Sequence, residues 1–284
     1  MTPIEAVAIA VVQGATELFP VSSLGHAVIL PRLFGWTIDP QARAFLPFLV
    51  MLHVGTAIAL FSYFWRDWWT LAISVVGIGP SWRVSQSRRL LLLIVLATLP
   101  AVIVGGVLEH PLRHLFASPI FAALFLVANA GLLLLGDRLQ PGAAPVRAER
   151  PLSTLKATDA IAIGCWQCLA LLPGISRSGA TIVGGVLRGI DHAGAAHFSF
   201  LIALPIILAA TALEVPKMIH GGNDHLLPLA ALCAIIAGAV ALASTAILMR
   251  WFRHHDQWAL RPFAIYCLVV GALCAILFST GMLA

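Results

Sequence analysis

The sequence predicts an all-α polytopic membrane protein built as an inverted-topology repeat. Of its 284 residues, 60% are hydrophobic and only 10% are charged, whereas a soluble domain carries about 25% charged residues. Several apolar runs reach the roughly 20 residues that a helix needs to cross a bilayer. Two short polar segments interrupt apolar sequence about half a chain apart. We therefore predict a single membrane domain made of two related halves, residues 1–150 and 151–284.

Six segments are apolar and long enough to be transmembrane helices. They lie at about residues 46–65, 90–108, 117–136, 198–215, 226–249 and 262–283. Two other regions, 4–34 and 158–190, each have the pattern of an apolar helix, a proline-containing polar loop and a second apolar helix. These helices are of about 10 to 16 residues, short for a full crossing. Each region is therefore expected to be a re-entrant helix-loop-helix hairpin.

The distribution of positive charge predicts the orientation in the membrane. With six crossing helices and two re-entrant hairpins, the loops 66–89, 137–157 and 250–261 fall on one side. An excess of Lys and Arg marks the cytoplasmic side of a membrane protein. Twelve such residues lie on this side, namely Arg66, Arg83, Arg88, Arg89, Arg138, Arg147, Arg150, Lys156, Arg188, Arg250, Arg253 and Arg261. Only Arg32, Arg43, Arg113 and Lys217 lie on the other side, so both termini are expected to face outward.

The same arrangement gives each half one hairpin and three crossing helices. Because three is odd, the second half is inverted relative to the first, and the two hairpin tips should meet near the middle of the membrane. The run that begins at Phe48 lines up loosely with the run that begins at Phe200, 152 positions later, and Ser23 precedes Ser176 by 153 positions. Chance similarity between apolar runs is the alternative, but the nearly constant offset favours a repeat.

The second polar loop has the composition of a phosphate-binding site. Residues 173–181 read Pro-Gly-Ile-Ser-Arg-Ser-Gly-Ala-Thr and open a helix, and the free N–H groups and dipole at a helix start favour an anion. Arg177 adds a planar, permanently charged fork that matches phosphate oxygens. An arginine that pairs with a carboxylate to hold the helices together is the alternative. The candidate phosphate-binding residues are Ser176, Arg177, Ser178, Gly179 and Thr181, with Ser22 from the first loop.

The first polar loop supplies candidates for metal binding and catalysis. Gln13 and Glu17 are four residues apart and share one helix face. Oxygen ligands that face a phosphate suit a hard divalent cation such as Mg²⁺ or Ca²⁺. Glu17 is alternatively a general base or an ion-pair partner of Arg177. Ser23 and His26 are candidate nucleophiles, and His26 can also transfer a proton; the sequence does not choose among Ser23, His26 and water.

The remaining polar residues within apolar sequence are expected to be structural. These are His53, Gln167, His192, His197 and Thr211. The five cysteines also lie in apolar runs and are expected to be free thiols that pack as small hydrophobic groups. The chain has no basic stripe with interleaved aromatic residues, so we expect no nucleic-acid partner.

At these residues the chain resembles the bacitracin-resistance type of undecaprenyl-diphosphate phosphatase. That family shows Glu or Gln four residues before Glu, followed by Pro-Val-Ser-Ser-x-Gly-His, and the matching segments here are 13–17 and 20–26. Its second motif, Pro-Gly-x-Ser-Arg-Ser-x-x-Thr, is matched by residues 173–181. The resemblance covers essentially the whole chain and includes the Phe-Ser-Phe-Leu run at 198–201.

The resemblance implies a metal-dependent enzyme of the bacterial inner membrane whose site is reached from the outer face. It would remove the terminal phosphate of undecaprenyl diphosphate, which recycles the lipid carrier for cell-wall synthesis and confers bacitracin resistance. The expected partners are the polyprenyl diphosphate lipid, the membrane and, in a possible homodimer, a second copy of the chain. The resemblance implies functional roles for Glu17, Ser23, His26, Ser176, Arg177 and Thr181.

Three positions depart from the family pattern, and one different function competes with the phosphatase. Gln13 stands at the first acidic position, and His197 and His192 stand where some members carry Glu and Arg. The competing function is a transporter or flippase for the polyprenyl monophosphate, which would use the same anion site without cleavage. Such a transporter has no need of the group Glu17, Ser23 and His26. A structural scaffold would leave Arg177 and Glu17 unexplained.

Overall fold

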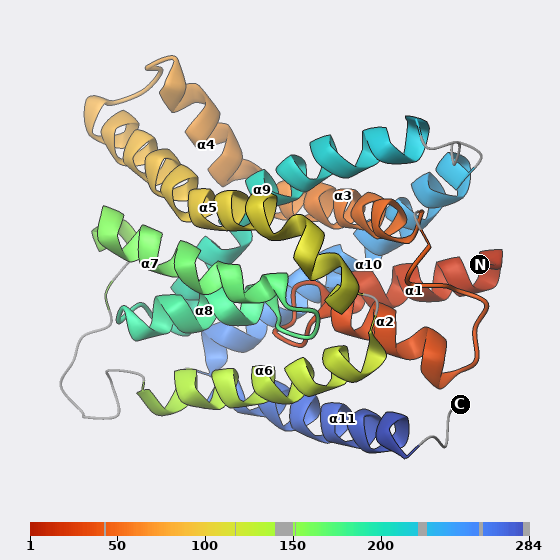
Figure 1. Ribbon diagram of the computed structural model, residues 1–284. Coiled ribbons are helices and arrows are strands. Elements are labelled where there is room, and N and C mark those ends of the chain that lie inside the picture. The colour runs from red at the N-terminus through yellow and green to blue at the C-terminus, as the bar shows by residue number, and fades with distance from the viewer. Residues whose placement is uncertain are drawn as a thin grey trace.

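The computed structural model describes residues 1–42, 44–116, 118–139, 150, 152–220, 226–255 and 258–280. All regular elements in these ranges are helices (Figure 1). Six of them are long and apolar enough to cross a membrane: α3 (Phe45–Tyr63), α5 (Ser81–Phe116), α6 (Pro119–Leu139), α9 (His192–His220), α10 (Leu227–His254) and α11 (Arg261–Ser279). The chain is therefore a multi-pass membrane protein, and each of the six helices coincides with a predicted crossing segment.

The two predicted hairpins are present. The first consists of α1 (Pro3–Thr16) and α2 (Ser23–Leu33), and the second of α7 (Ala157–Cys168), a 3₁₀ turn η2 (Leu169–Leu171) and α8 (Arg177–Leu187). In Figure 1, α1 and α2 run inward from the right and return to it, while α7 and α8 do the same from the left. Their connecting loops lie in the middle of the molecule.

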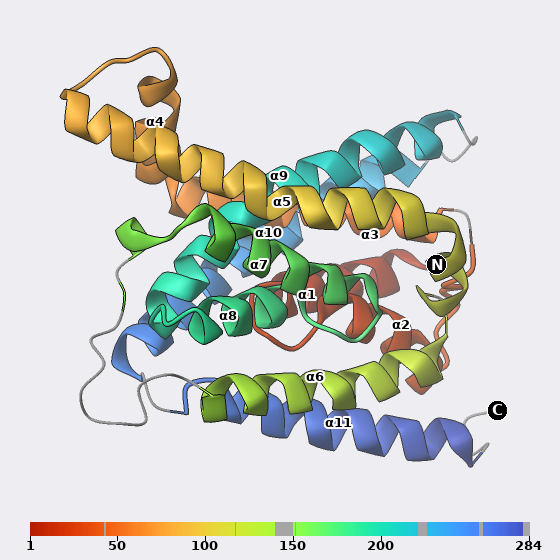
Figure 2. The same ribbon diagram turned by 60° about the vertical axis from the view of Figure 1, so that its left-hand side comes forward.

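The two ends of the helix bundle can be compared with the two membrane sides predicted from the loops. The start of α1 and the end of α11 lie at the right of Figure 1, and the turn between α4 (Trp65–Val75) and α5 lies at the far left, with the start of α7 and the end of α8. The 60° rotation in Figure 2 preserves this separation. The start of α1 and the end of α11 therefore lie at one end of the bundle, and the α4–α5 turn, the start of α7 and the end of α8 lie at the other.

One segment differs from its prediction as a loop. Residues 65–75 form helix α4, which turns back against the first part of α5. Its 11 residues are too few to cross a bilayer. Leu71 is buried while Trp65 and Trp69 are exposed, the pattern of a helix that lies at a membrane surface. The sequence-based prediction was wrong because Arg66 and Asp67 were taken as loop residues.

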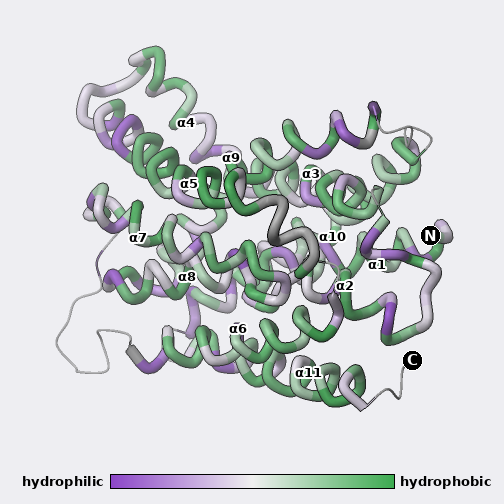
Figure 3. Tube along the Cα trace, viewed as in Figure 1, coloured by the Kyte–Doolittle hydropathy of each residue, from purple (hydrophilic) through white to green (hydrophobic). Residues whose placement is uncertain are grey.

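Close packing of long helices forms the frame that holds the hairpins. Helix α10 packs along α1 and α3, α5 packs along α7, and α6 packs along α11. The glycines Gly14 and Gly55 lie against the backbone of α10, where a Cβ would meet the carbonyl groups of Ala237 and Ala234. Small residues at such crossings let helix backbones approach closely. Hydrophobic residues dominate these long helices in Figure 3, with hydrophilic residues near helix ends and in the centre.

The helix pairs are consistent with two related halves. The first hairpin packs its helix α1 on α10 of the second half, and the second hairpin packs α7 on α5 of the first half. In the predicted repeat α1 corresponds to α7 and α10 corresponds to α5, so the α1–α10 contact and the α7–α5 contact are equivalent. The inverted repeat itself stays a prediction.

Candidate functional site

Both hairpin tips direct the start of a helix into the centre of the bundle. Ser22 caps α2, where its Oγ accepts a hydrogen bond from the backbone N–H of Gly25 at 3.2 Å. Ser176 caps α8 in the same way, with its Oγ 3.1 Å from the backbone N of Gly179. Two helix N-termini, each with a partial positive charge, therefore lie close to one another and favour an anion.

Ser22 also holds the first tip in an unusual backbone conformation. Its φ is +66°, a left-handed region that residues other than glycine rarely adopt. Such strain persists only where the surrounding structure enforces it, and it is frequent at functional sites. In the second tip the corresponding freedom comes from Gly174, with φ +109°.

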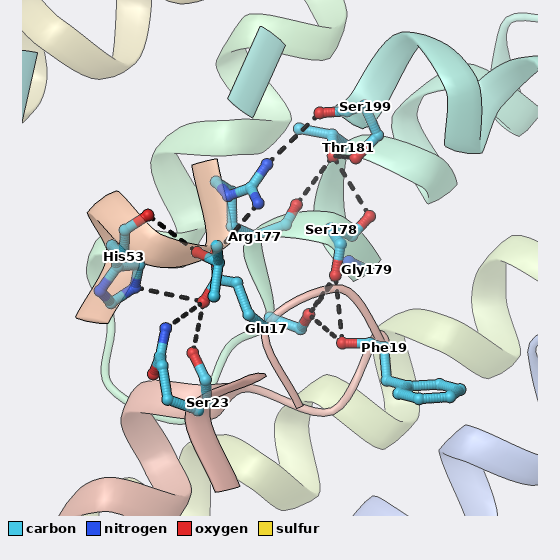
Figure 4. Close-up of polar contacts among 12 residues, drawn as sticks. Glu17, Phe19, Ser23, His53, Arg177, Ser178, Gly179, Thr181 and Ser199 are labelled. Carbon is cyan, nitrogen blue, oxygen red and sulfur yellow. Dashed lines mark hydrogen bonds and ion pairs between the residues drawn. The ribbon is translucent and has the colours of Figure 1, made fainter. Parts of the chain in front are cut away.

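Glu17 is the centre of a buried polar cluster between the tips (Figure 4). Its Oε1 lies 3.1 Å from a guanidinium nitrogen of Arg177. Its Oε2 accepts hydrogen bonds from Gln13 Nε2 at 3.0 Å and from the Ser23 hydroxyl at 2.6 Å. The ion-pair partner that the sequence allowed for Glu17 is therefore present, and it joins the first hairpin to the second.

His53 of α3 is the fourth partner of Glu17. Its Nε2 lies 3.2 Å from Glu17 Oε2, and its Nδ1 lies 2.8 Å from the carbonyl oxygen of Leu49. Both ring nitrogens thus face acceptors, an arrangement that is satisfied when both carry a hydrogen. The carboxylate of Glu17 thus contacts the permanently charged guanidinium of Arg177 and the imidazole of His53.

A pocket of about 210 Å³ opens beside this cluster. Its polar wall comes from both hairpins and from α3, and consists of Glu17, Ser22, Ser23, His53, Gln167, Ser176 and Arg177. The apolar wall comes from α3, α5 and α9, and includes Leu46, Leu49, Val50, Ala101, Ile206 and Ile207. A ligand with an anionic head and a hydrocarbon chain matches this division.

Asn129 of α6 connects the two tips. Its Oδ1 accepts from the backbone N of Ser176 at 3.0 Å, and its Nδ2 donates to the carbonyl oxygen of Pro20 at 2.9 Å. The hydroxyls of Ser176 and Ser178 lie 3.4 Å and 3.1 Å from the carbonyl oxygen of Phe19, to which they donate. Asn129, which belongs to neither tip, therefore adds to the direct hydrogen bonds between the tips in fixing their relative position.

Three candidate phosphate-binding residues lie behind Arg177 rather than in the pocket wall. The Ser178 hydroxyl donates to the carbonyl oxygen of Phe19 in the first tip, and the backbone N–H of Gly179 donates to Ser176 Oγ within the second tip. The Thr181 hydroxyl lies 2.8 Å from the carbonyl oxygen of Arg177 and 2.6 Å from the hydroxyl of Ser199, and Arg177 donates to the carbonyl oxygen of Ser199 at 3.3 Å. In this arrangement these residues hold Arg177 and the start of α8 in place.

His26 points away from the Glu17 cluster. Its Nδ1 lies 2.6 Å from the carbonyl oxygen of Ser22, and its Nε2 lies 2.8 Å from the hydroxyl of Tyr266 on α11. The ring is buried and stacks on Tyr266. Of the two candidate nucleophiles in the first loop, only Ser23 borders the pocket.

The donor set for a divalent cation is small but fits. No three His, Cys, Asp or Glu side chains come together as a metal site within the described ranges. However, Gln13 Oε1 is buried beside Glu17 and has no hydrogen-bond partner there. This orphaned oxygen and the Glu17 carboxylate match the preference of Mg²⁺, which binds one or two protein groups and completes its shell with phosphate oxygens and water.

Three residues of the site were not predicted as functional: His53 and Asn129, whose partners are distant in sequence, and Gln167, which was expected to be structural but lines the pocket. His53 was expected to be structural, and Asn129 was not considered. His53 lies 36 positions after Glu17, and Asn129 lies 47 positions before Ser176. A usable signal for His53 was its place in the run that begins at Phe48, which lines up with the run that begins at Phe200 in the predicted repeat. For Asn129 the signal was a lone amide in an otherwise apolar helix, where an unpaired polar group is costly.

Comparison with known proteins gives a consistent match. A family model described as bacitracin resistance protein BacA matches residues 6–273. The undecaprenyl-diphosphatase of Granulibacter bethesdensis is 60% identical over 280 residues, which cover 95% of each chain. The undecaprenyl-diphosphatase of Acidiphilium cryptum is 53% identical over 283 residues, covering 99% of this chain and 100% of the relative. That of Gluconacetobacter diazotrophicus is 53% identical over 274 residues, 96% of each chain.

Proposed function

We infer that this chain, which belongs to the bacitracin resistance protein BacA family, is an undecaprenyl-diphosphatase. The observation that carries this inference is the buried contact between Glu17 of one tip and Arg177 of the other, at the wall of a pocket that is otherwise mostly apolar. The reaction releases inorganic phosphate and leaves undecaprenyl phosphate. The high identity to proteins named as undecaprenyl-diphosphatases supports the same function.

The pocket supports a specific pose for the lipid. We propose that the terminal phosphate lies against Arg177 and the start of α8, where the guanidinium and free backbone N–H groups can share its charge. The start of α2 faces the same space and can assist. The prenyl chain lies along the apolar wall from α3, α5 and α9, where its burial is favourable.

Ser23 is the nucleophile that the geometry supports best. Its oxygen would form a bond to the terminal phosphorus as the bond to the bridging oxygen breaks, and undecaprenyl phosphate would leave with the bridging oxygen. The proton of Ser23 would pass to Glu17, whose Oε2 is 2.6 Å away. Water would then hydrolyse the phosphoserine and release phosphate. Because phosphoryl transfer has a loose transition state, positioning and charge stabilisation count for more than a strong base.

A divalent cation is part of this proposal. Glu17 and Gln13 would hold Mg²⁺ or Ca²⁺ with the help of substrate oxygens. When bound, the cation supplies neutralisation of the charge on the phosphates. Arg177 and the helix starts would orient the head group in either case. We expect chelation by EDTA to lower turnover and added Mg²⁺ or Ca²⁺ to restore it.

We propose that the protein lies in the bacterial inner membrane with its arginine-rich loops in the cytoplasm, so that lipid reaches the site from the outer face. Impermeant thiol labelling of Ser85→Cys and Gln41→Cys, both at exposed positions, tests this. We expect only the second to label from outside, and the reverse result would overturn the orientation. A homodimer is not needed for the reaction, because one chain supplies every residue of the cluster.

The test of the function is phosphate release from undecaprenyl diphosphate by the detergent-purified protein. We expect release that depends on the enzyme. The transporter alternative is not favoured, and it predicts movement of polyprenyl phosphate across a vesicle membrane without phosphate release. Folded protein that moves the lipid but releases no phosphate would replace the phosphatase with the transporter.

A further inference from the structure

Gln167 is a buried amide with no partner in the last turn of α7. The residue is only 2% exposed. Neither its Nε2 nor its Oε1 has a hydrogen-bond partner among the described residues. A buried polar group without a partner destabilises a protein, so native structures keep few of them. The amide therefore calls for a partner that the described part of the chain does not supply.

Gln167 also lies in the wall of the pocket that holds the Glu17 cluster. It precedes Arg177 by ten positions on the same hairpin, and its nearest pocket-lining neighbours in sequence, Ala170 and Leu171, have no polar side chain. Gln13 provides a contrast, because its Nε2 is already bonded to Glu17. Gln167 is thus a pocket residue whose side-chain amide makes no hydrogen bond to any residue that the structure describes.

We propose that Gln167 is a substrate-binding residue that recognises the diphosphate head group. Its Nε2 would donate to a phosphate oxygen, and its Oε1 would accept a hydrogen bond from a water held beside that phosphate. An amide suits this position because it satisfies both needs without adding a further charge beside Arg177. This inference rests on the proposed function and adds a specific contact to it.

The proposal predicts that replacing the Gln167 amide weakens substrate binding without lowering the stability of the protein. Gln167→Met keeps the approximate size of the side chain and removes the unpaired amide. Without ligand, the variant should unfold at the same temperature as the wild type or at a higher one, because a buried polar group without partners is replaced by an apolar group. Its KM for undecaprenyl diphosphate should rise by about 10-fold or more, the effect of a lost hydrogen bond to a charged group.

The experiment measures thermal unfolding, kcat and KM for wild type, Gln167→Met and Gln167→Glu. Gln167→Glu keeps the shape but replaces the donor by a carboxylate, so its KM should rise further. The control is Thr245→Val, a buried polar-to-apolar change on α10 whose hydroxyl bonds the carbonyl oxygen of Ala241. Thr245 does not line the pocket, and we expect its KM to be unchanged. Inorganic pyrophosphate serves as a second probe through the rise in unfolding temperature that it causes.

The outcomes separate this inference from the proposed function. A lower unfolding temperature with unchanged KM in Gln167→Met would show a structural amide and overturn the inference. Unchanged values of both would also overturn it. If the wild type releases no phosphate, the proposed function fails, and pyrophosphate still decides on Gln167. A thermal shift that is smaller in Gln167→Met than in wild type supports the contact, and equal shifts or no shift in either protein overturn it.

Discussion

At the residue scale, the two candidate nucleophiles of the first loop are separated by what each side chain touches. Ser23 donates to Glu17 at the pocket wall, whereas the His26 ring is held between Ser22 and Tyr266. The two residues are close in sequence, so spacing alone could not distinguish them. Their different surroundings lead to different expected effects on catalysis.

We predict that Ser23→Ala lowers kcat by about 1,000-fold or more, because removal of a nucleophile leaves only binding and charge stabilisation. His26→Ala should lower kcat by no more than about 10-fold, since the ring acts only through Ser22 and α11. Single-turnover phosphate release measures both. A Ser23→Ala rate within 10-fold of wild type would instead assign the attack to water.

His53 should act through Glu17. His53→Ala removes one hydrogen bond to a charged group, which contributes about 1.5–3 kcal/mol, so kcat/KM should fall by roughly 10-fold or more. His53→Gln retains an N–H donor that can reach Glu17, and its loss should be clearly smaller. Steady-state kinetics of the two variants make the comparison. Equal losses would mean that the contact to Glu17 is not what matters.

Much of the site could be predicted from local sequence. Glu17, Ser23 and Arg177 occur within short polar segments in apolar surroundings. Polar and ionisable residues are unfavourable in such surroundings, so their presence there points to function. The tip residues Ser178 and Thr181 share these segments, but the structure gives their hydroxyls partners within the protein. Asn129 and Gln167 sit in apolar helices, and only the three-dimensional arrangement shows which groups surround them.

At the element scale, the clamp between the hairpin tips is made by Asn129. Asn129→Leu leaves the carbonyl of Pro20 and the N–H of Ser176 without this partner, at a cost of about 1–3 kcal/mol for each unsatisfied group. We predict a lower unfolding temperature and, because the tips lose their alignment, a kcat reduced by about 10- to 100-fold. Thr245→Val is again the matched control. A normal kcat in stable Asn129→Leu protein would show that Asn129 is not needed to align the two tips.

The start of α7 is held by Asp159, which is buried. Its carboxylate accepts from the backbone N of Lys156 at 3.0 Å and from Arg150 and Arg188 at 3.0 Å and 2.7 Å. Burial raises the pKa of Asp159, but the hydrogen bonds from Lys156, Arg188 and Arg150 outweigh burial and hold this pKa below its ordinary value. The folded state therefore favours the ionised form.

The sign of this shift predicts a pH dependence. A carboxyl group with a lowered pKa in the folded state stabilises the protein fully above its ordinary pKa, about 3.9. That stabilisation disappears as the pH falls through the folded value. The difference in unfolding temperature between wild type and Asp159→Asn should be constant near neutral pH and shrink below about pH 4. If the difference in unfolding temperature stays the same down to pH 3, Asp159 does not stabilise the folded state through its ionised form.

Element prediction succeeded where hydrophobicity and length agree. All six crossing helices and both hairpins follow from apolar runs and the proline-containing loops between them. Helix α4 was missed because its charged residues and short length resemble those of a loop. It packs against α5, a contact that local sequence does not reveal.

At the scale of the whole molecule, the site exists only because two hairpins from opposite ends of the bundle meet. Glu17, Ser23 and Gln13 come from the first, and Arg177 and Gln167 from the second. The long helix pairs α3 with α10 and α6 with α11 join the two halves of the chain. The frame thus keeps Glu17 and Arg177 together in a buried position where neither charge is favourable alone.

The most direct test of this account is a double-mutant cycle on the two tips. It uses Glu17→Gln, Arg177→Met and the double variant, with phosphate release from undecaprenyl diphosphate as the readout and thermal unfolding as the check on folding. Because the two residues act as one unit, each single change should lower kcat/KM by about 1,000-fold or more, and the double variant should be hardly worse. Near-wild-type turnover in either folded single variant, or losses that multiply in the double variant, would contradict a single site shared by the two tips.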